Sequence, residues 1–255
     1  MAGSPSAPMK ISFRFLLVVA SLFAVTARAG ETTAPAAASK PETDFKIIRG
    51  APIQFPVALL HDGINHGETR ILLEVDSEGR LVDSLVLAYT HEPFADAALR
   101  AIRQWRFEPA RLKGEPVGAV ADCTIVFNVD GILFYQRVGL PVFKNREPSE
   151  DKFAYRPYEL IALDRIPTPQ HVEPPVYPQE WIDQGMHGKV TIDFYIDETG
   201  AVRMPSGTSS PYPLLDAAAT AAIRHWRFSP PLHQGQPVLA HCEQVFTFER
   251  AASKP

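Results

Sequence analysis

The sequence predicts an α+β protein with two tandem small domains, each a three-stranded antiparallel sheet with helices packed on one face. First, the chain repeats itself, because Trp105-Arg-Phe-Glu-Pro109 returns as Trp226-Arg-Phe-Ser-Pro230 at a constant offset of 121 positions. Second, each copy shows strand alternation, then a helical stripe, then alternation again. A period this long is too large for a solenoid repeat and matches two whole domains.

Each copy begins with a predicted β-hairpin. In the first copy, apolar residues alternate along Glu68 to Val75, and Asp76-Ser-Glu-Gly79 then supplies a turn before the return strand with Leu81, Leu85 and Leu87. The second copy alternates from Val190 to Ile196 and turns at Asp197-Glu-Thr-Gly200. The Asp-x-x-Gly pattern lacks the further carboxylates of a calcium loop, which favours a plain turn.

A helix follows each hairpin. The first copy places apolar residues on one helical stripe that ends at Trp105, and the second copy repeats the stripe up to Trp226. Pro109 and Pro230 prevent either helix from resuming. A domain of about 75 residues buries only about 60% of its unfolded surface, so each core should depend on a few aromatic side chains. The predicted core aromatics are Trp105, Phe107, Trp226 and Phe228.

A last strand follows Gly114 in the first copy and Gly235 in the second. In the first copy Ala121, Cys123, Ile125 and Phe127 alternate with more polar residues, which predicts a strand with one buried and one wet face. Cys123 and Cys242 both fall on the inward parity, so buried thiols are favoured. A disulfide between them stays open as the alternative, because the chain is predicted to be exported.

The N-terminus reads as an export signal. Met9-Lys10 begins a basic end, Phe15 to Val25 is apolar, and Ala27-Arg-Ala29 is a small-residue cleavage site. The apolar run is shorter than the ~20 residues that span a bilayer, so cleavage after Ala29 is expected, with an uncleaved membrane anchor as the alternative. The predicted boundaries are a signal peptide at 1–29, a flexible leader at 30–44, the first domain at 45–128, a linker at 129–170 and the second domain at 171–250.

Composition and motifs exclude several function classes. The formal net charge is −4, and no stretch interleaves basic residues with aromatics, so nucleic acid is not expected as a partner. No nucleophile triad, phosphate loop or paired carboxylate stands out, which predicts a protein without enzymatic activity and without a cofactor. His225, His233 and His241 next to Cys242 occur only in the second copy, but their spacing of eight matches no common ligand set. No metal site is predicted, although a metal-dependent catalyst remains a minor alternative.

The order of these features resembles the C-terminal domain of TonB. The motifs that carry the resemblance are Phe55-Pro56 and Tyr177-Pro178 ahead of a short helix, then Trp-Arg-Phe-x-Pro and Gly-x-Pro-Val. It covers about Gln54 to Asn128 and Val176 to Glu249. The resemblance implies a domain in the bacterial periplasm that binds an extended peptide of an outer-membrane transporter at its last strand.

Strand addition has a physical basis, since an edge strand offers unpaired backbone N–H and C=O groups to an extended peptide. The alternative is that the side chains flanking this edge are merely solvated. The residues expected to flank the docked peptide are His241, Glu243, Val245 and Thr247 in the second copy and Val120, Asp122, Thr124 and Val126 in the first.

Three departures from the family argue against a conventional energy transducer. The apolar segment Phe15 to Val25 contains no His, the leader is short, and Pro174 and Pro52 stand where the family has a glutamine. The sequence therefore predicts a periplasmic binding or adaptor protein, linked through its partner to TonB-dependent transmembrane transport. Two alternatives remain: a membrane-anchored energy transducer, and a structural module whose last strands pair with each other or across a homodimer.

Overall fold

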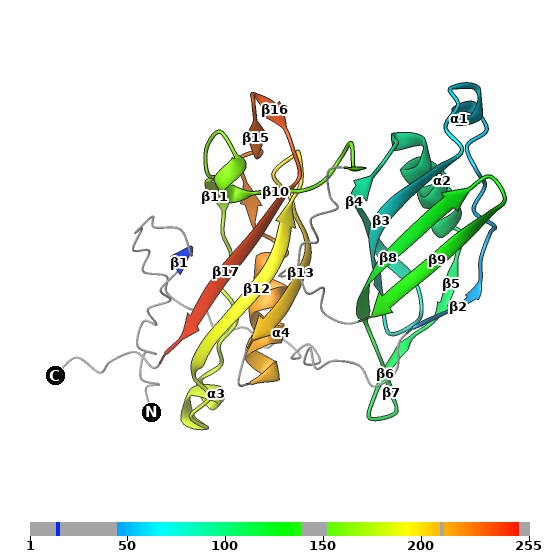
Figure 1. The fold of residues 1–255 in the computed structure, drawn as a ribbon. Coiled ribbons are helices and arrows are strands. Elements are labelled where there is room, and N and C mark those ends of the chain that lie inside the picture. The colour runs from blue at the N-terminus through cyan, green and yellow to red at the C-terminus, as the bar shows by residue number, and fades with distance from the viewer. Residues whose placement is uncertain (1–13, 16–44, 139–151, 210–211, 250–255) are drawn as a thin grey trace, which may run out of the picture. The chain divides into compact units, whose positions relative to one another are not determined.

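The computed structural model describes residues 14–15, 45–138, 152–209 and 212–249 (Figure 1). Its contacts divide the chain into two compact units that meet in sequence between Pro157 and Tyr158. We call the unit before this boundary domain 1 and the unit after it domain 2; the short strand β1 (Arg14–Phe15) belongs with domain 2. Each unit contains helices and antiparallel strands, so the predicted α+β class is confirmed.

Domain 1 contains a four-stranded antiparallel sheet in the order β4-β3-β8-β9. These strands are β3 (His66–Val75), β4 (Leu81–Tyr89), β8 (Ala119–Asn128) and β9 (Gly131–Val138). Helix α2 (Glu92–Ile102) packs on one face of the sheet with its buried stripe (Figure 1). The fourth strand, β9, exceeds the three strands that the sequence predicts for this domain.

Shorter elements complete domain 1. Helix α1 (Ala58–His61) precedes the hairpin β3–β4. Two small antiparallel ladders lie outside the main sheet: β2 (Lys46–Arg49) pairs with β5 (Arg106–Glu108), and β6 (Ala110–Leu112) pairs with β7 (Glu115–Val117).

Domain 2 repeats the hairpin, helix and last strand in a five-stranded sheet with the order β13-β12-β17-β1, in which β10 also pairs with β17. Its main elements are β12 (Gly188–Ile196), β13 (Val202–Ser209), α4 (Pro213–Ile223) and β17 (Ala240–Phe248). The smaller ones are β10 (Tyr158–Glu159), the 3-10 helix η2 (Leu160–Ala162), β11 (Pro169–His171) paired with β14 (Arg227–Phe228), α3 (Gln179–Asp183), and β15 (Leu232–His233) paired with β16 (Gln236–Pro237).

An equivalent tryptophan anchors each core. Trp105 and Trp226 are buried, and each indole N–H donates a 2.8 Å hydrogen bond to a backbone carbonyl, of Ala51 in domain 1 and of Glu173 in domain 2. This bond satisfies the one polar atom of a large buried ring and ties the segment after β2 or β11 to the end of the helix. The neighbouring Phe107 and Phe228 are buried as well.

The turn glycines of the two hairpins are structural equivalents. Gly79 and Gly200 have φ of 75° and 88°, a region that favours glycine. A Cβ atom at either position would lie 2.0 Å from the carbonyl oxygen of Phe107 or Phe228, and the same phenylalanine's N–H donates to the glycine carbonyl. The turn therefore holds the strand that follows the helix, which explains why glycine occurs there in both copies.

The cysteines lie in separate cores. Cys123 packs in the domain 1 core and Cys242 in the domain 2 core, and both are free thiols. Burial raises the pKa of each thiol well above its ordinary value, and the nearby carboxylate of Asp122 or Glu159 raises it further. Neither thiol is therefore suited to act as a thiolate nucleophile at neutral pH.

Much of the predicted linker, residues 129–170, is structured. Its first part forms β9 of domain 1. Its later part lies on domain 2, where Tyr158 N–H donates to the Leu239 carbonyl at 2.8 Å and Leu163 packs against the core. The Asp164 carboxylate accepts the N–H groups of Gln234 and Gly235 at 2.8 and 2.7 Å. These hydrogen bonds lower the pKa of Asp164.

One carboxylate in domain 2 is buried at a cost. Asp216, in the first turn of α4, is 8% exposed, and its Oδ1 has no hydrogen-bond partner among the described residues. It packs so closely on Gly207 that a Cβ there would lie 2.9 Å from its Cγ. This desolvation raises its pKa to about 6. Domain 1 has Ala95 at the corresponding helix position.

We expect domain 2 to lose stability as pH rises through the Asp216 titration. Burial raises the pKa of Asp216 from its ordinary value of 3.8 to about 6 in the folded chain, so the stabilisation by the protonated acid is complete below about pH 4 and is lost by about pH 6. Asp216→Asn should raise the free energy of unfolding at pH 7 by roughly 1 to 3 kcal/mol and remove this pH dependence. Urea unfolding at pH 4, 5.5 and 7, followed by the Trp226 indole signal, measures the free energy of unfolding of both proteins. If this free energy changed with pH equally in the wild-type chain and in Asp216→Asn, the prediction would be contradicted.

We also expect Gly200→Ala to destabilise domain 2 more than Gly235→Ala. Both glycines have positive φ, so both variants bear a left-handed backbone cost of about 1 to 2 kcal/mol. Only Gly200 also meets a carbonyl oxygen, whereas nothing lies within 4 Å of a Cβ at Gly235. The free energy of unfolding of Gly200→Ala should therefore be lower than that of Gly235→Ala by at least about 1 kcal/mol, and this difference measures the cost of the clash with the carbonyl oxygen. Equal losses would mean that the Phe228 carbonyl moves aside freely.

Candidate functional site

The last strand of domain 2, β17, pairs along its whole length with β12 on one side. The antiparallel register runs without a break from Gly188 opposite Phe248 to Ile196 opposite Ala240. One row of β17 backbone groups is therefore satisfied within the sheet.

The other side of β17 is only partly covered. β10 pairs in parallel with its first two residues, Ala240 and His241. β1 pairs antiparallel with Gln244 and Val245. No other strand within the described ranges pairs with this side, so Cys242, Glu243, Thr247 and Phe248 have no described strand beside them there, and the edge continues from Cys242 to Phe248 past the two residues beside β1. We call this stretch the β17 edge.

Side chains of β17 alternate between the core and the outer face. The inward residues are buried, and His241, Glu243, Val245 and Thr247 are half-buried on the outer face. The structure thus places these four residues at the parity that the sequence predicts. Glu243, Val245 and Thr247 lie on the β17 edge, and β1 lies beside Val245.

His241 is part of a small polar cluster. Its Nδ1 lies 3.5 Å from Glu159 Oε2, its Nε2 lies 3.9 Å from Asp193 Oδ1, and its ring lies 5.4 Å from the Tyr195 ring. Because β10 already pairs at this position, His241 lies next to the β17 edge and not on it.

The sequence analysis missed Gln244. This residue faces inward between Cys242 and Phe246, is fully buried, and its Nε2 donates to the Val245 carbonyl at 2.8 Å. Its Oε1 has no partner among the described residues. A buried acceptor without a donor is costly, so Gln244 is a candidate to accept a hydrogen bond from an added peptide. The feature of the sequence that could have identified Gln244 is an amide side chain at an inward-facing position of the last strand, where domain 1 has Cys123.

The prediction of an edge strand is wrong for domain 1. β8 carries Val120, Asp122, Thr124 and Val126, but β9 pairs with it antiparallel from Ala121 to Asn128, and β3 covers its other side. Asp122 is also engaged, since its Oδ2 lies 2.6 Å from Arg70 Nη2. The four predicted residues therefore flank an interior strand.

The reversal into β9 has a local cause. Asn128 Oδ1 accepts the Asp130 N–H at 3.2 Å, which is an Asx-type turn, and Gly131 begins the return strand. Phe134 then packs 5.3 Å from Trp105, centroid to centroid, and Gln136 Nε2 donates to the Phe45 carbonyl at 2.9 Å. The return strand β9 therefore lies within the segment 129–170 that the sequence predicts as a linker.

β9 also excludes one alternative. A structural module in which the last strands of the two domains pair with each other needs a free side on β8, and both sides of β8 are taken by β3 and β9.

The histidines of domain 2 are not gathered in one place. His225 is exposed after α4, while His233 stacks on Tyr158 at 4.4 Å and its Nδ1 lies 2.7 Å from the Ala162 carbonyl oxygen. Cys242 faces the core, on the opposite side of the strand from His241. Within the part of the chain that the structure describes, no three His, Cys, Asp or Glu side chains form a metal-binding group.

None of the described helices combines the length and the apolar character that crossing a bilayer requires. The predicted signal peptide and leader, 1–44, fall outside the described residues except for β1.

Comparison with known proteins identifies a family and a similar solved structure. A family model described as Gram-negative bacterial TonB protein C-terminal matches residues 51–129 and 173–249, one match in each domain and together more than half of the chain. A similar solved structure is the solution NMR structure of Pseudomonas aeruginosa TonB CTD, with 26% identity over 38% of this chain and 97% of that chain and a TM-score of 0.32. No curated protein matches.

We expect hydrogen exchange to distinguish the two last strands. In β8 neighbours on both sides protect the amides from Ala121 to Asn128. On the outer side of the β17 edge the one described strand is β1, which the chain beginning at Gly30 lacks, so alternate amides should exchange rapidly there. The measurement is amide exchange by NMR on the chain beginning at Gly30. Uniform slow exchange from Cys242 to Phe248 would contradict an open edge.

Proposed function

This chain belongs to the TonB C-terminal family, with one family domain in each half, and from that premise we propose that it is a periplasmic binding or adaptor protein. Domain 2 takes an extended peptide of an outer-membrane transporter, or of another envelope partner, by strand addition at the β17 edge. The family itself points to a protein-binding role in the cell envelope.

The observation that carries this proposal is the contrast between the two last strands. Domain 1 fills the outer side of β8 with β9, along the eight residues from Ala121 to Asn128. Domain 2 has only two-residue strands on this side among the described residues: β10 beside Ala240 and His241, and β1 beside Gln244 and Val245. Unsatisfied backbone groups on an ordered strand are a template for another extended chain.

The chain supplies an internal precedent for this geometry. β1 lies antiparallel to β17, with Arg14 opposite Val245 and Phe15 opposite Gln244. These two residues fall within the predicted signal peptide, so cleavage after Ala29 removes them. The mature chain then offers the same backbone groups to a partner.

Side chains must contribute to the affinity. The β17 edge presents about three outward pairs of backbone N–H and C=O groups, so about six hydrogen bonds at roughly 1 kcal/mol net each, against an association cost of about 4 to 15 kcal/mol. Main-chain bonds alone therefore give weak binding at best. Val245, Thr247 and the free Oε1 of Gln244 supply candidate contacts that would make binding selective.

We expect peptide binding to depend on the peptide's own N–H groups. The experiment titrates the chain beginning at Gly30 with a synthetic peptide of about ten residues from the periplasmic end of an outer-membrane transporter, read by amide shifts from Cys242 to Phe248. Two N-methylated versions, one for each alternate set of residues, are compared. Only the set that faces β17 should lose affinity, by tenfold or more, because each missing donor costs about 1 kcal/mol or more.

Domain 1 is the internal control, since β8 amides should not shift at the same peptide concentrations. Equal loss with both N-methylated peptides, or no shift on the β17 edge at millimolar peptide, would reject strand addition. Fractionation of the host into periplasm and membrane separately tests the alternative of an uncleaved, membrane-anchored energy transducer.

A further inference from the structure

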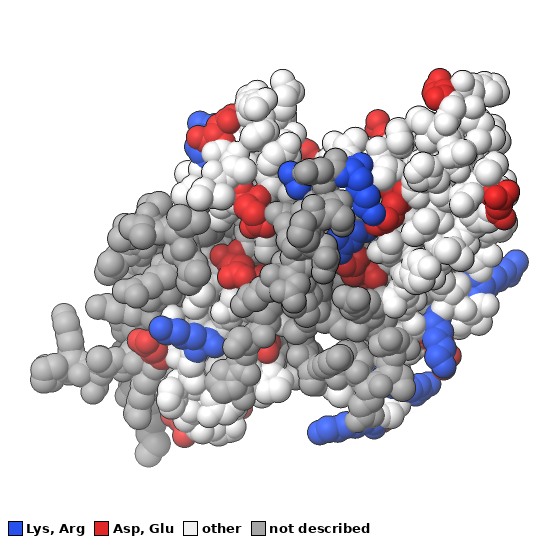
Figure 2. All heavy atoms as spheres, in the orientation of Figure 1, with Lys and Arg blue, Asp and Glu red and all other residues white. Residues whose placement is uncertain are grey.

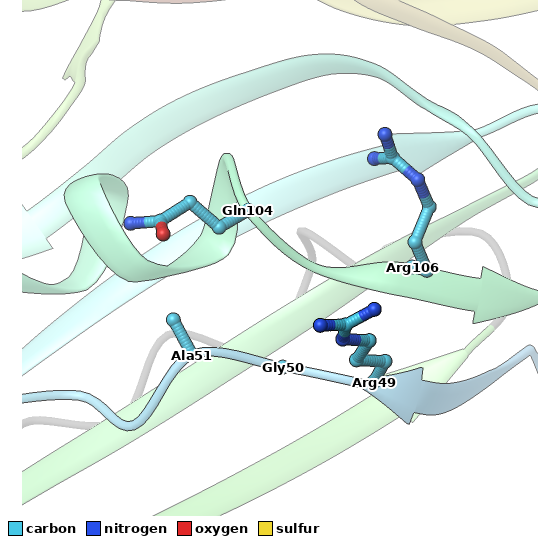
Figure 3. Close-up of a pocket in the computed structure, with 5 residues that line it drawn as sticks. All are labelled: Arg49, Gly50, Ala51, Gln104 and Arg106. Carbon is cyan, nitrogen blue, oxygen red and sulfur yellow. The ribbon is translucent and has the colours of Figure 1, made fainter.

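Domain 1 has an open pocket of about 370 Å³ that the β17 edge does not involve. It lies where β2 ends and where the chain leaves α2, and it is lined by Arg49, Gly50, Ala51, Gln104 and Arg106 (Figure 3). The two arginines come from different elements, one from the end of β2 and the other from the start of β5.

The backbone around the pocket is fixed by the core. Arg49 and Arg106 lie opposite each other in the β2–β5 ladder. The next two residues after Arg49 lie on the Trp105 indole: a Cβ at Gly50 would lie 2.8 Å from its Nε1, and Ala51 accepts its N–H. The segment that presents Arg49 is therefore fixed by the buried tryptophan.

The charge of the pocket is uncompensated. Arg106 Nη1 donates to the Trp105 carbonyl at 3.2 Å, and neither arginine forms an ion pair with any described residue. Like charges directly opposite in a ladder are destabilising, and a guanidinium cannot relieve the repulsion by losing its proton. The nearest acidic residue along β5, Glu108, lies opposite Lys46 and not opposite Arg49. Figure 2 shows more basic than acidic side chains on this side of domain 1.

Domain 2 differs from domain 1 at these positions. The tryptophan bonds and the ladder registers make His171 the counterpart of Arg49, Arg227 that of Arg106, and Glu173 that of Ala51. A histidine, charged only when protonated, thus replaces one of the two arginines, and Glu173 Oε1 lies 3.2 Å from its Nε2. Domain 2 has a carboxylate side chain at the position where domain 1 has the small side chain of Ala51.

We propose that the domain 1 pocket binds a carboxylate of a partner polypeptide, an Asp or Glu side chain, between Arg49 and Arg106. The bound carboxylate takes the place that Glu173 occupies in domain 2. Guanidinium groups suit this ligand because their planar N–H donors match the two carboxylate oxygens. Both arginines are exposed, so the binding is weak and falls with rising salt. It gives an acidic partner a second contact that is independent of the β17 edge.

The test titrates the chain beginning at Gly30, at low ionic strength, with acetyl-Gly-Glu-Gly-amide and with its Gln counterpart. Saturable amide shifts at Gly50, Ala51 and Arg106 are expected with the Glu peptide, and at least tenfold weaker binding with the Gln peptide. The corresponding amides of domain 2, Val172 and Arg227, should not shift.

Matched variants make the test specific. Ala51→Glu places a carboxylate in the pocket from within and should weaken binding of the Glu peptide at least tenfold, whereas Ala51→Gln, of the same size and neutral, should change it less than threefold. Arg49→Gln and Arg106→Gln should each weaken it at least fivefold. The Trp105 indole signal reports whether each variant keeps its fold.

Three outcomes overturn the proposal: equal binding of the Glu and Gln peptides, equal effects of Ala51→Glu and Ala51→Gln, or inorganic phosphate binding tenfold more tightly than the Glu peptide. The last would identify a phosphate site in place of a carboxylate site.

Discussion

The structure depends on one constraint: the backbone groups of a strand must be bonded on both sides, or one side must face solvent or a partner. Both domains use the same hairpin, helix and last strand, and they differ in how this constraint is met. Domain 1 pairs β9 with the outer side of its last strand, so β4 and β9 are the edges of its sheet, whereas in domain 2 the described strands β1 and β10 lie beside only four residues on the outer side of β17. The duplicated fold therefore has its last strand in the interior of the sheet in one copy and near the edge of the sheet in the other.

The tryptophan bond links the cores to the surface in both domains. A buried indole N–H needs an acceptor, and here the acceptor is a carbonyl in the segment that leads from the first short strand. The bond therefore fixes the side chains on either side of that carbonyl. In domain 1 these include an arginine, and in domain 2 a histidine and a glutamate, so one conserved packing arrangement carries two different surface charges.

Periodic patterns predicted most of the fold. The stripes ending at Trp105 and Trp226 and the turns at Gly79 and Gly200 predicted the helices and hairpins, because each is determined by residues close in sequence. The outward parity of Val245 and Thr247 followed in the same way. The sequence did not predict the strand that pairs with the outer side of β8, since an alternating pattern is the same for an edge strand and an interior strand. It did not predict the pocket either, because Arg49 and Arg106 meet only through the ladder of β2 with β5.

The short turn between β8 and β9 has a consequence for the evolution of the first copy. A strand joined to its acceptor by so short a turn competes at an effective concentration of millimolar or more, which a dilute peptide in solution does not reach. Selection for recognition by β8 is thereby relaxed, and its exposed face is free to diverge or to acquire other tasks. After such a duplication, the copy whose last strand is covered by its own chain would keep a structural role, while the other copy would keep a strand that a partner can reach.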